Sequence, residues 1–563
     1  MTWGGQALSF LLILTVACSS TAAPSSERAT VAAIDPPASP SPVAAQEPSG
    51  FLESLACDLP PDELARVWQG YYPGRSGEIQ VIPKEPNVIG TWYPHSGPWE
   101  HVQRVPMLWY GPGHVPATGK VHRPATMADV APTMAEFLGF PFEAPDGALM
   151  TEAIYSSAER DEAPRLILTL VWDGAGRNLL AEYPDAWPNL KRLIRGGAWY
   201  EEFTVGSSPS MTSPVHTTLG TGAFPRRHGV VDGRLRLGKD LARPEFNWPE
   251  VSERPTLADL YDRDNGNRPV VGLVALHTWH LSMMGSGSYL EGGDRDVAIL
   301  RESTRWGLSP RNSRFYQTRR YPNAVRGLDR AARRLDVSDG RLDGIWMEED
   351  FGERPSLLTR TPVFSLWQTK VLKEVIRREG FGADEVPDLL FTNYKQIDLV
   401  GHRWSMNSPQ MEAVLRSSDR ALGQLVRILD REVGRGRWVL ALTADHGLTP
   451  HRSRSGAVFM VPRVLGEDIR AVFDDQDERK VLETTRPTQM WIDIEELKSN
   501  GFTLADVARY ISRYTRGQYE DDPGSLSESE RRERLFSLAI PGRMLERLPC
   551  LPGSGAGAGG GTG

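Results

Sequence analysis

Four short apolar runs constrain the fold of this chain more than any other feature. They occupy residues 166–172, 270–276, 389–394 and 438–442. Continuous apolar runs of this length are typical of strands that are buried on both faces. Helical stretches alternate with them, at residues 179–196, 364–378 and 411–433. The alternation predicts an α/β fold, a three-layer sandwich with a mostly parallel central sheet between helices.

Metal-binding residue types follow three of these runs. Asp173 follows the first run, Asp398 and His402 follow the third, and Asp445 and His446 follow the fourth. Ligands of open α/β sheets bind beyond the carboxyl ends of the strands. A single Asp after a strand is often a turn residue or a helix N-cap, but three such positions favour a shared site. Carboxylates mixed with imidazoles, without clustered Cys, suit zinc or a similar ion.

A hydroxyl-rich segment at residues 207–222 holds the candidate nucleophile. Pro214 fits the first turn of a helix, which places Thr212 at or just before the helix N-terminus. Free N–H groups at that position favour a phosphate, and a metal ion can lower the pKa of a hydroxyl there. On local grounds alone, an N-cap role for Thr212 or Ser213 is the simpler interpretation.

Together these segments resemble the type I phosphodiesterase/nucleotide pyrophosphatase branch of the alkaline phosphatase superfamily. The matching motifs are Trp-Asp-Gly at 172–174, Thr-Ser-Pro-Val-His at 212–216, Pro-Arg-Arg-His-Gly at 225–229, Asp-Leu-Val-Gly-His at 398–402 and Asp-His-Gly at 445–447. The resemblance implies an alkaline-phosphatase-like α/β sandwich that holds two zinc ions, other divalent ions being possible. It also implies that a Thr or Ser nucleophile cleaves phosphoric esters.

The same resemblance assigns a role to each residue of the site. Thr212 is the implied nucleophile. The implied zinc ligands are Asp173, Thr212, Asp445 and His446 at one ion, and Asp398 and His402 at the other. His216 and His228 match positions that are not ligands in this family, so we expect them to be structural.

One further ligand of the second zinc is absent where the family carries it. The resemblance requires a His far downstream of the Asp-His-Gly motif, yet none follows His451, which comes too soon after His446. Residues 75–139 instead look like the C-terminal segment of the family in its internal order. In that segment His95 takes the ligand position. We expect His95 to complete the site, with His451 and His101 as alternatives.

This order of segments reads as a circular permutation. Residues 51–150 would be the displaced C-terminal piece of a single catalytic domain, 51–545, whose remainder is 165–545. Permutation is tolerated because the termini of compact domains often lie close together. Residues 233–388 are expected to contain a cap insertion. In the rival interpretation the first segment is a separate module.

Charge adds little about the substrate. The net charge of −8 gives no general attraction to nucleic acid, and no nucleic-acid-binding surface is evident. Residues 301–341 are rich in Arg. A solvated helical face is the simplest interpretation, and a cap over an anionic substrate is the functional alternative.

The N-terminus predicts export. The apolar run at residues 7–17 is too short to span a bilayer comfortably. It ends at Cys18, so residues 1–18 look like a bacterial lipoprotein signal with Cys18 as the lipidated residue. Residues 19–50 are rich in Pro, Ala and Ser, which is typical of a flexible tether, and residues 551–563 read as a disordered tail. We expect a protein anchored by lipid on the outer face of a bacterial membrane, or secreted.

Two other cysteines, Cys57 and Cys550, flank the proposed domain. Disulfides persist in exported proteins. The permuted ends should lie close together, so a Cys57–Cys550 bridge would hold them in place of the lost peptide link. Two unrelated buried thiols are the alternative, because the sequence does not give the geometry that a bridge requires.

The substrate is the least constrained feature. Relatives commonly carry a phosphate-binding Asn where Asp232 or Gly233 stands here. The Lys and Arg of phosphomonoesterase relatives would fall near residues 276–280, where no Lys or Arg stands. His277 and His280 are candidate substrate-binding replacements, and a satisfied polar pair after a strand is the alternative. We therefore expect a phosphodiesterase or nucleotide pyrophosphatase that acts on a small phosphate ester through a phospho-threonine intermediate. A phosphomonoesterase, or a lipid-anchored binding protein on a decayed hydrolase scaffold, is the alternative.

Overall fold

The computed structural model describes residues 50–155, 162–243, 249–302, 304–309, 311–474, 479–520 and 522–551, all of which belong to one compact unit. Cys18, the signal segment and nearly all of the proposed tether and tail lie outside the described residues. None of the helices in the described ranges is both long and apolar enough to cross a bilayer.

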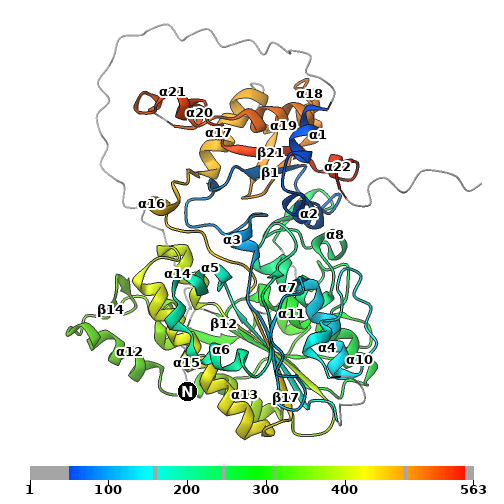
Figure 1. Ribbon diagram of the computed structural model, residues 1–563, viewed down its shortest axis with the longest axis vertical. Helices are drawn as coiled ribbons and strands as arrows, with labels where there is room; N and C mark the ends of the chain where they lie inside the picture. The colour runs from blue at the N-terminus through cyan, green and yellow to red at the C-terminus, as the bar shows by residue number, and fades with distance from the viewer. Residues whose placement is uncertain are drawn as a thin grey trace, which may run out of the picture. The chain divides into compact units, whose positions relative to one another are not determined.

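A nine-stranded sheet forms the centre of this unit (Figure 1), in the order β13-β12-β11-β16-β6-β17-β3-β7-β4. The four predicted strands are adjacent and parallel. They are β11 (Val271–Ala275), β16 (Asp388–Tyr394), β6 (Leu166–Trp172) and β17 (Trp438–Thr443). The predicted α/β fold with a mostly parallel sheet is confirmed. Because these strands are parallel neighbours, their carboxyl ends share one edge of the sheet.

Further strands extend the sheet on one side. β12 (Val297–Glu302) pairs in parallel with β11, and β13 (Arg305–Gly307) pairs antiparallel with β12. Residues 233–388, which were expected to contain a cap insertion, supply three strands of the central sheet. A short hairpin, β14 (Ile345–Trp346) and β15 (Glu349–Asp350), also lies within this span.

On the other side the sheet includes the segment that precedes β6 in the chain. β3 (Met107–Tyr110) pairs antiparallel with β17, and β7 (Ala198–Tyr200) and β4 (Gly119–Val121) follow it in the sheet. Residues 105–138 contribute to the same hydrophobic core as the parallel strands. This part of the chain therefore does not form a core of its own.

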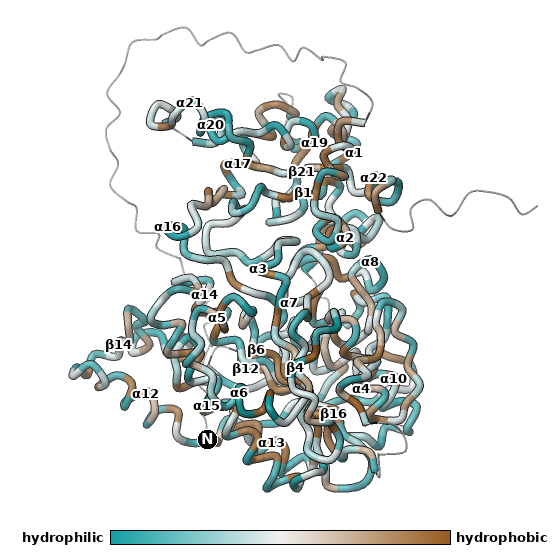
Figure 2. Tube along the Cα trace, in the orientation of Figure 1, coloured by the Kyte–Doolittle hydropathy of each residue, from teal (hydrophilic) through white to brown (hydrophobic). Residues whose placement is uncertain are grey.

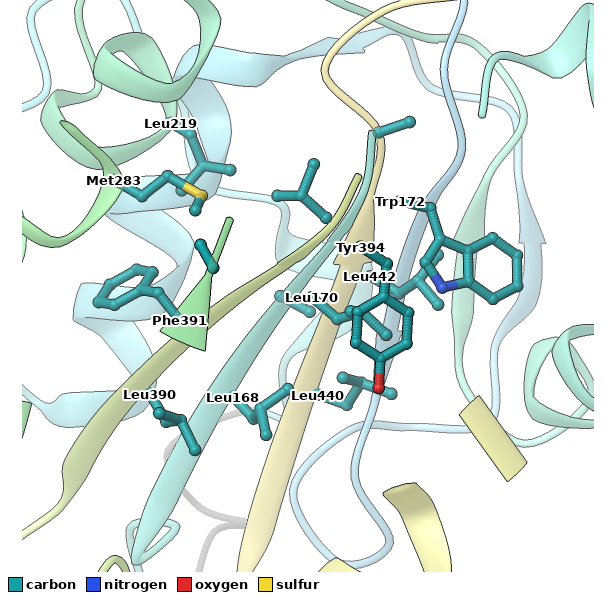
Figure 3. Close-up of a cluster of buried hydrophobic side chains, with 14 of the residues drawn as sticks. Leu168, Leu170, Trp172, Leu219, Met283, Leu390, Phe391, Tyr394, Leu440 and Leu442 are labelled. Atoms are coloured by element: carbon teal, nitrogen blue, oxygen red, sulfur yellow. The ribbon is translucent and has the colours of Figure 1, made fainter. Parts of the chain in front are cut away.

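The strands of the sheet bury side chains on both faces (Figure 3). Leu170 and Trp172 of β6 point to one face together with Tyr394 of β16. Phe391 of β16 points to the other face, toward Met283. All five side chains are almost fully buried, and each contributes about 1.5–3 kcal/mol through its burial. Figure 2 shows hydrophobic residues along the central strands and hydrophilic residues on outlying helices such as α16 (Arg452–Ser455).

Two of the three predicted helices are present. They are α13 (Pro362–Glu379) and α15 (Pro409–Leu429), which pack against each other. The third, predicted over residues 179–196, is wrong as a single helix. It is divided into α5 (Arg177–Glu182) and α6 (Pro188–Ile194), because the prolines within it cannot donate the hydrogen bonds of a continuous helix.

A second, antiparallel sheet was not predicted from the sequence. Its order is β19 (Leu482–Thr485), β20 (Gln489–Ile492), β1 (Ile79–Pro83) and β21 (Phe536–Pro541). It has a separate hydrophobic core, to which α17 (Pro462–Phe473) and α19 (Leu504–Arg513) contribute (Figure 1). The pairing of β1 with the edge strand β21 joins a segment from early in the chain to one from near its end.

A disulfide ties these distant segments together. Cys57, the last residue of α1 (Phe51–Cys57), is bonded to Cys550, and their Cα atoms lie 5.6 Å apart. The two cysteines are 493 positions apart in the sequence. The structure therefore contains the Cys57–Cys550 bridge and not two unrelated buried thiols.

The double variant Cys57→Ser/Cys550→Ser is expected to be less stable than the wild type by about 2–5 kcal/mol, because the cross-link restricts the unfolded chain. Thermal unfolding followed by circular dichroism measures the difference. A reductant should lower the melting temperature of the wild type and leave that of the double variant unchanged. A wild type that is insensitive to the reductant would contradict the prediction.

Candidate active site

Three buried carboxylates meet at the carboxyl edge of the central sheet. Asp173 directly follows β6, and Asp445 follows β17. Asp398 lies in the first turn of α14 (Gln396–Trp404), which follows β16, and His402 lies one turn later on this helix. The three carboxylates are at most 1% exposed. They converge because β16, β6 and β17 are adjacent and parallel.

Three imidazoles surround one of these carboxylates. The Oδ1 atom of Asp398 lies 3.6 Å from His95 Nε2, 3.3 Å from His402 Nε2 and 3.7 Å from His446 Nε2. His446 Nε2 also lies 3.4 Å from Asp173 Oδ1. The structure therefore places His95 beside residues that follow it by some three hundred positions, as the permuted order requires.

The two alternative histidines lie elsewhere. His101 Nδ1 is 2.8 Å from Glu85 Oε1. His451 Nδ1 is 2.7 Å from Ser453 Oγ, at the start of α16. Neither lines the cavity beside the carboxylates.

Hydrogen bonds orient the three imidazoles. The Nδ1 atoms of His95, His402 and His446 each lie within 3.0 Å of a backbone carbonyl oxygen. A carbonyl only accepts, so Nδ1 carries the proton and Nε2 is directed at the carboxylates. Among the described residues, buried atoms without a hydrogen-bond partner include Asp398 Oδ1, Asp445 Oδ2 and His446 Nε2. A divalent cation would satisfy these atoms, so the residues fit a zinc-like metal centre.

Thr212 lies beside this cluster. It is the first residue of α7 (Thr212–Thr221), after the extended residue Met211, and so it is not the N-cap. Thr212 and Ser213 line a cavity of about 440 Å³ together with His95, Asp398 and His402. Because the first N–H groups of a helix lack intrahelical partners, Thr212 stands where the helix favours an anion.

Lys395 occupies the centre of the site, although this residue was not predicted from the sequence. Its Nζ atom lies 2.7 Å from Asp173 Oδ1, 2.8 Å from Asp398 Oδ2 and 3.2 Å from Thr212 Oγ1. The signal in the sequence is a Lys three residues before Asp398, directly after a buried strand. An ammonium group in this position balances part of the negative charge of the cluster.

The pKa values show how strongly the cluster favours positive charge. Burial lowers the pKa of His446, but Asp445 and Asp173 outweigh burial and raise it to about 9. Burial raises the pKa of Asp173, but Lys395 and His446 together outweigh burial and lower it to about 2. Burial, reinforced by Asp173, raises the pKa of Asp445 to about 6. The carboxylates therefore hold more negative charge than Lys395 alone neutralises.

The remaining predicted histidines take different positions. His228 Nε2 lies 3.1 Å from Thr218 Oγ1, as a structural residue would. His216 is buried, with Nε2 3.6 Å from Asp445 Oδ2 and Nδ1 3.3 Å from His280 Nδ1. Neither His216 nor His280 lines the cavity, whereas His277 does. Burial lowers the pKa of His277 to about 4, so this residue is neutral near pH 7.

The two candidate replacements for the missing Asn also differ. Gly233 lines the cavity. Asp232 is fully buried and accepts a hydrogen bond of 2.8 Å from Arg486 Nε. Asp232 does not line the cavity itself but holds Arg486, which does. Arg486 lies in the loop between β19 and β20 of the second, antiparallel sheet (the small sheet), and no local sequence pattern pointed to it.

The basic residues of the cavity come from unexpected segments. They are Arg234, Arg243, Lys395 and Arg486. None of the described residues between 301 and 341 lines it, so the Arg-rich stretch is not a cap over this cavity.

Comparison with known proteins agrees with this geometry. The family model of type I phosphodiesterase/nucleotide pyrophosphatase matches residues 167–537, well over half of the chain. The chain belongs to this family, a branch of the alkaline phosphatase superfamily, and is a phosphoric ester hydrolase. The resemblance read from the sequence is confirmed. The match begins at β6, so His95 lies outside it.

Several curated relatives share parts of the chain. Alkaline phosphatase PafA of Elizabethkingia meningoseptica is 25% identical over 418 residues, 65% of this chain and 76% of the relative. Alkaline phosphatase PhoV of Synechococcus elongatus is 31% identical over 327 residues, 51% of this chain and 59% of the relative. Human ectonucleotide pyrophosphatase/phosphodiesterase family member 7 is 24% identical over 272 residues, which are 48% of this chain and 45% of the relative. The crystal structure of PafA aligns over 62% of this chain and 76% of PafA, with 17% identity and a TM-score of 0.46.

Proposed function

We propose that this hydrolase is zinc-dependent and cleaves its ester through Thr212, with a phospho-threonine intermediate. The observation that carries the proposal is the position of Thr212 Oγ1, at the N-terminus of α7, on a cavity shared with His95, Asp398 and His402. A hydroxyl at a helix N-terminus, beside a metal-binding cluster, is placed for attack on a phosphoryl group.

The residues that would hold the metal divide into two groups, each with its own carboxylates. Asp173, Thr212, Asp445 and His446 would hold one zinc ion, and His95, Asp398 and His402 the other. Bound there, zinc would supply positive charge against the phosphoryl oxygens and lower the pKa of a coordinated hydroxyl or water. The Nε2 atoms that face Asp398 and the unpartnered carboxylate oxygens support this assignment.

The residues of the chain account for the chemical steps. The Thr212 hydroxyl gives its proton to solvent, Oγ1 attacks phosphorus, and the bond from phosphorus to the leaving oxygen breaks. That oxygen leaves with the bonding pair and takes a proton from water. Lys395 Nζ, 3.2 Å from Thr212 Oγ1, stabilises the deprotonated hydroxyl before attack. The N-terminus of α7 favours the negative phosphoryl group. Water then hydrolyses the phospho-threonine and restores the Thr212 hydroxyl.

The organisation of the wider chain is also part of the proposal. The pairing of β3 with β17, the contact of His95 with Asp398 and the Cys57–Cys550 bridge support a circularly permuted catalytic domain. The apolar run that ends at Cys18 supports export with a lipid anchor. A decayed scaffold is disfavoured, because every expected metal-site residue lies in the cluster or on its cavity.

Paired aryl phosphate monoester and diester substrates test this function. Purified protein should hydrolyse at least one of them, lose the activity after chelation, and regain it when zinc is added. Full activity in the presence of the chelator would contradict metal dependence. Binding of inorganic phosphate without turnover of either ester would favour the decayed scaffold instead.

A further inference from the structure

The charge of the cavity beside Thr212 points to the class of ester. The absence of Lys or Arg directly after β11 favoured diesters. The structure supplies the cations from elsewhere, since Arg234, Arg243 and Arg486 line the cavity with Lys395. These residues come from separate segments, and one of them belongs to the small sheet.

Arg486 enters the cavity from the loop between β19 and β20. A Cβ atom built on Gly233 would lie 3.1 Å from Arg486 Nη2, so the guanidinium fills the space that a side chain at position 233 would need. Arg486 Nη2 also lies 3.9 Å from Met211 Sδ. Met211 directly precedes Thr212, so the guanidinium lies close to the start of α7.

Buried contacts fix the orientation of Arg486. Its Nε donates to Asp232 Oδ1 at 2.8 Å, and Asp232 is fully buried. Asp232 also accepts from the backbone N–H of Arg234 at 3.1 Å, and its Oδ2 lies 3.5 Å from Gln489 Nε2. The side chain of Arg486 keeps 32% of its surface exposed. Asp232 thus holds one edge of the guanidinium while the group lines the cavity.

We propose that Arg486 binds a non-bridging oxygen of the transferred phosphoryl group and, with Arg234 and Arg243, makes the site select phosphate monoesters over diesters. A monoester has three non-bridging oxygens and approaches two negative charges near neutral pH, whereas a diester carries one. The planar guanidinium presents several N–H donors in a fixed geometry that suits phosphate. Asp232 is the positioning residue for Arg486. This inference rests on the proposed function.

The test compares the wild type with Arg486→Gln, which removes the charge but keeps a hydrogen-bonding side chain. Arg486→Gln should lower kcat/KM for an aryl phosphate monoester by about 10- to 100-fold, the value of one charge-assisted hydrogen bond. For the matched aryl diester, the kcat/KM of Arg486→Gln should fall much less. Asp232→Asn should lower the monoester-to-diester ratio in the same direction, whereas a purely structural defect would lower both rates together. Arg463→Gln, on an exposed ion pair of α17, is the matched control.

Calorimetric titration with inorganic phosphate gives a second readout that needs no turnover. Arg486→Gln should weaken phosphate binding by a similar factor, and Arg463→Gln should leave it unchanged. Equal losses on both esters, unchanged phosphate affinity, or a wild type that prefers the diester would each overturn the inference. If no protein hydrolyses either ester, the proposed function fails, while the phosphate titration still decides the role of Arg486.

Discussion

Replacement of Thr212 by Ala is expected to lower kcat by about 1,000-fold or more while the protein keeps most of its metal. The reason is that Thr212 supplies the attacking oxygen, whereas the carboxylates and imidazoles that surround the site remain. Turnover of an aryl phosphate, with metal content measured on the same preparation, gives both quantities. A hydroxyl in the same place should restore part of the activity, so Thr212→Ser is expected to fall between wild type and Thr212→Ala.

Thr217→Ala is a matched control for this experiment. Thr217 is also a buried threonine of α7, but its Oγ1 bonds to the backbone oxygen of Ser213 within the helix. Thr217→Ala should therefore lower the stability of the protein more than its kcat. Turnover close to wild type in Thr212→Ala would show that the nucleophile is misassigned, or that water attacks the ester directly.

Replacement of His95 by Ala is expected to remove about one equivalent of metal, because a zinc position with three protein ligands tolerates the loss of one poorly. Activity should fall with the metal. Metal analysis after dialysis against zinc-containing and zinc-free buffer measures the loss. His95 is the informative position, because it lies in the segment outside the family match and its Nε2 faces Asp398.

His451→Ala is the control for this prediction. His451 is the other candidate ligand, and in the structure it bonds to Ser453 instead. This variant should keep its full metal content. Full zinc in His95→Ala combined with loss in His451→Ala would falsify the assignment and the permuted order together.

The parts of the site that follow strands could be predicted from the sequence. Asp173, Asp398 and Asp445 each stand after a run that is apolar enough to be a buried strand, and parallel strands bring their ends together. The order of motifs within residues 75–139 pointed to His95, which the structure places beside Asp398. These features depend on local pattern and topology, which a single sequence contains.

The basic residues of the site could not be predicted in this way. Lys395 follows a buried strand as the carboxylates do, but its contact with Thr212 Oγ1 depends on the path of a long side chain, which the spacing of residues does not reveal. Arg486 reaches the cavity only because the small sheet folds beside Gly233. That sheet was not predicted, because its strands are short and come from widely separated segments. No repeated alternation of apolar and polar residues indicates them. The division of the helix at 179–196 was not predicted, because the spacing of apolar residues favoured one helix although the segment contains prolines.

The bond between Cys57 and Cys550 also changes what happens when the chain is cut. It closes nearly all of the described chain into a covalent ring. A protease that cleaves one peptide bond inside the ring would leave the two fragments attached, and the strand pairs that cross the break would still hold them in register. If the protein is exported as proposed, to a setting where reductants are scarce, such a nicked molecule would persist as one particle until its disulfide is reduced.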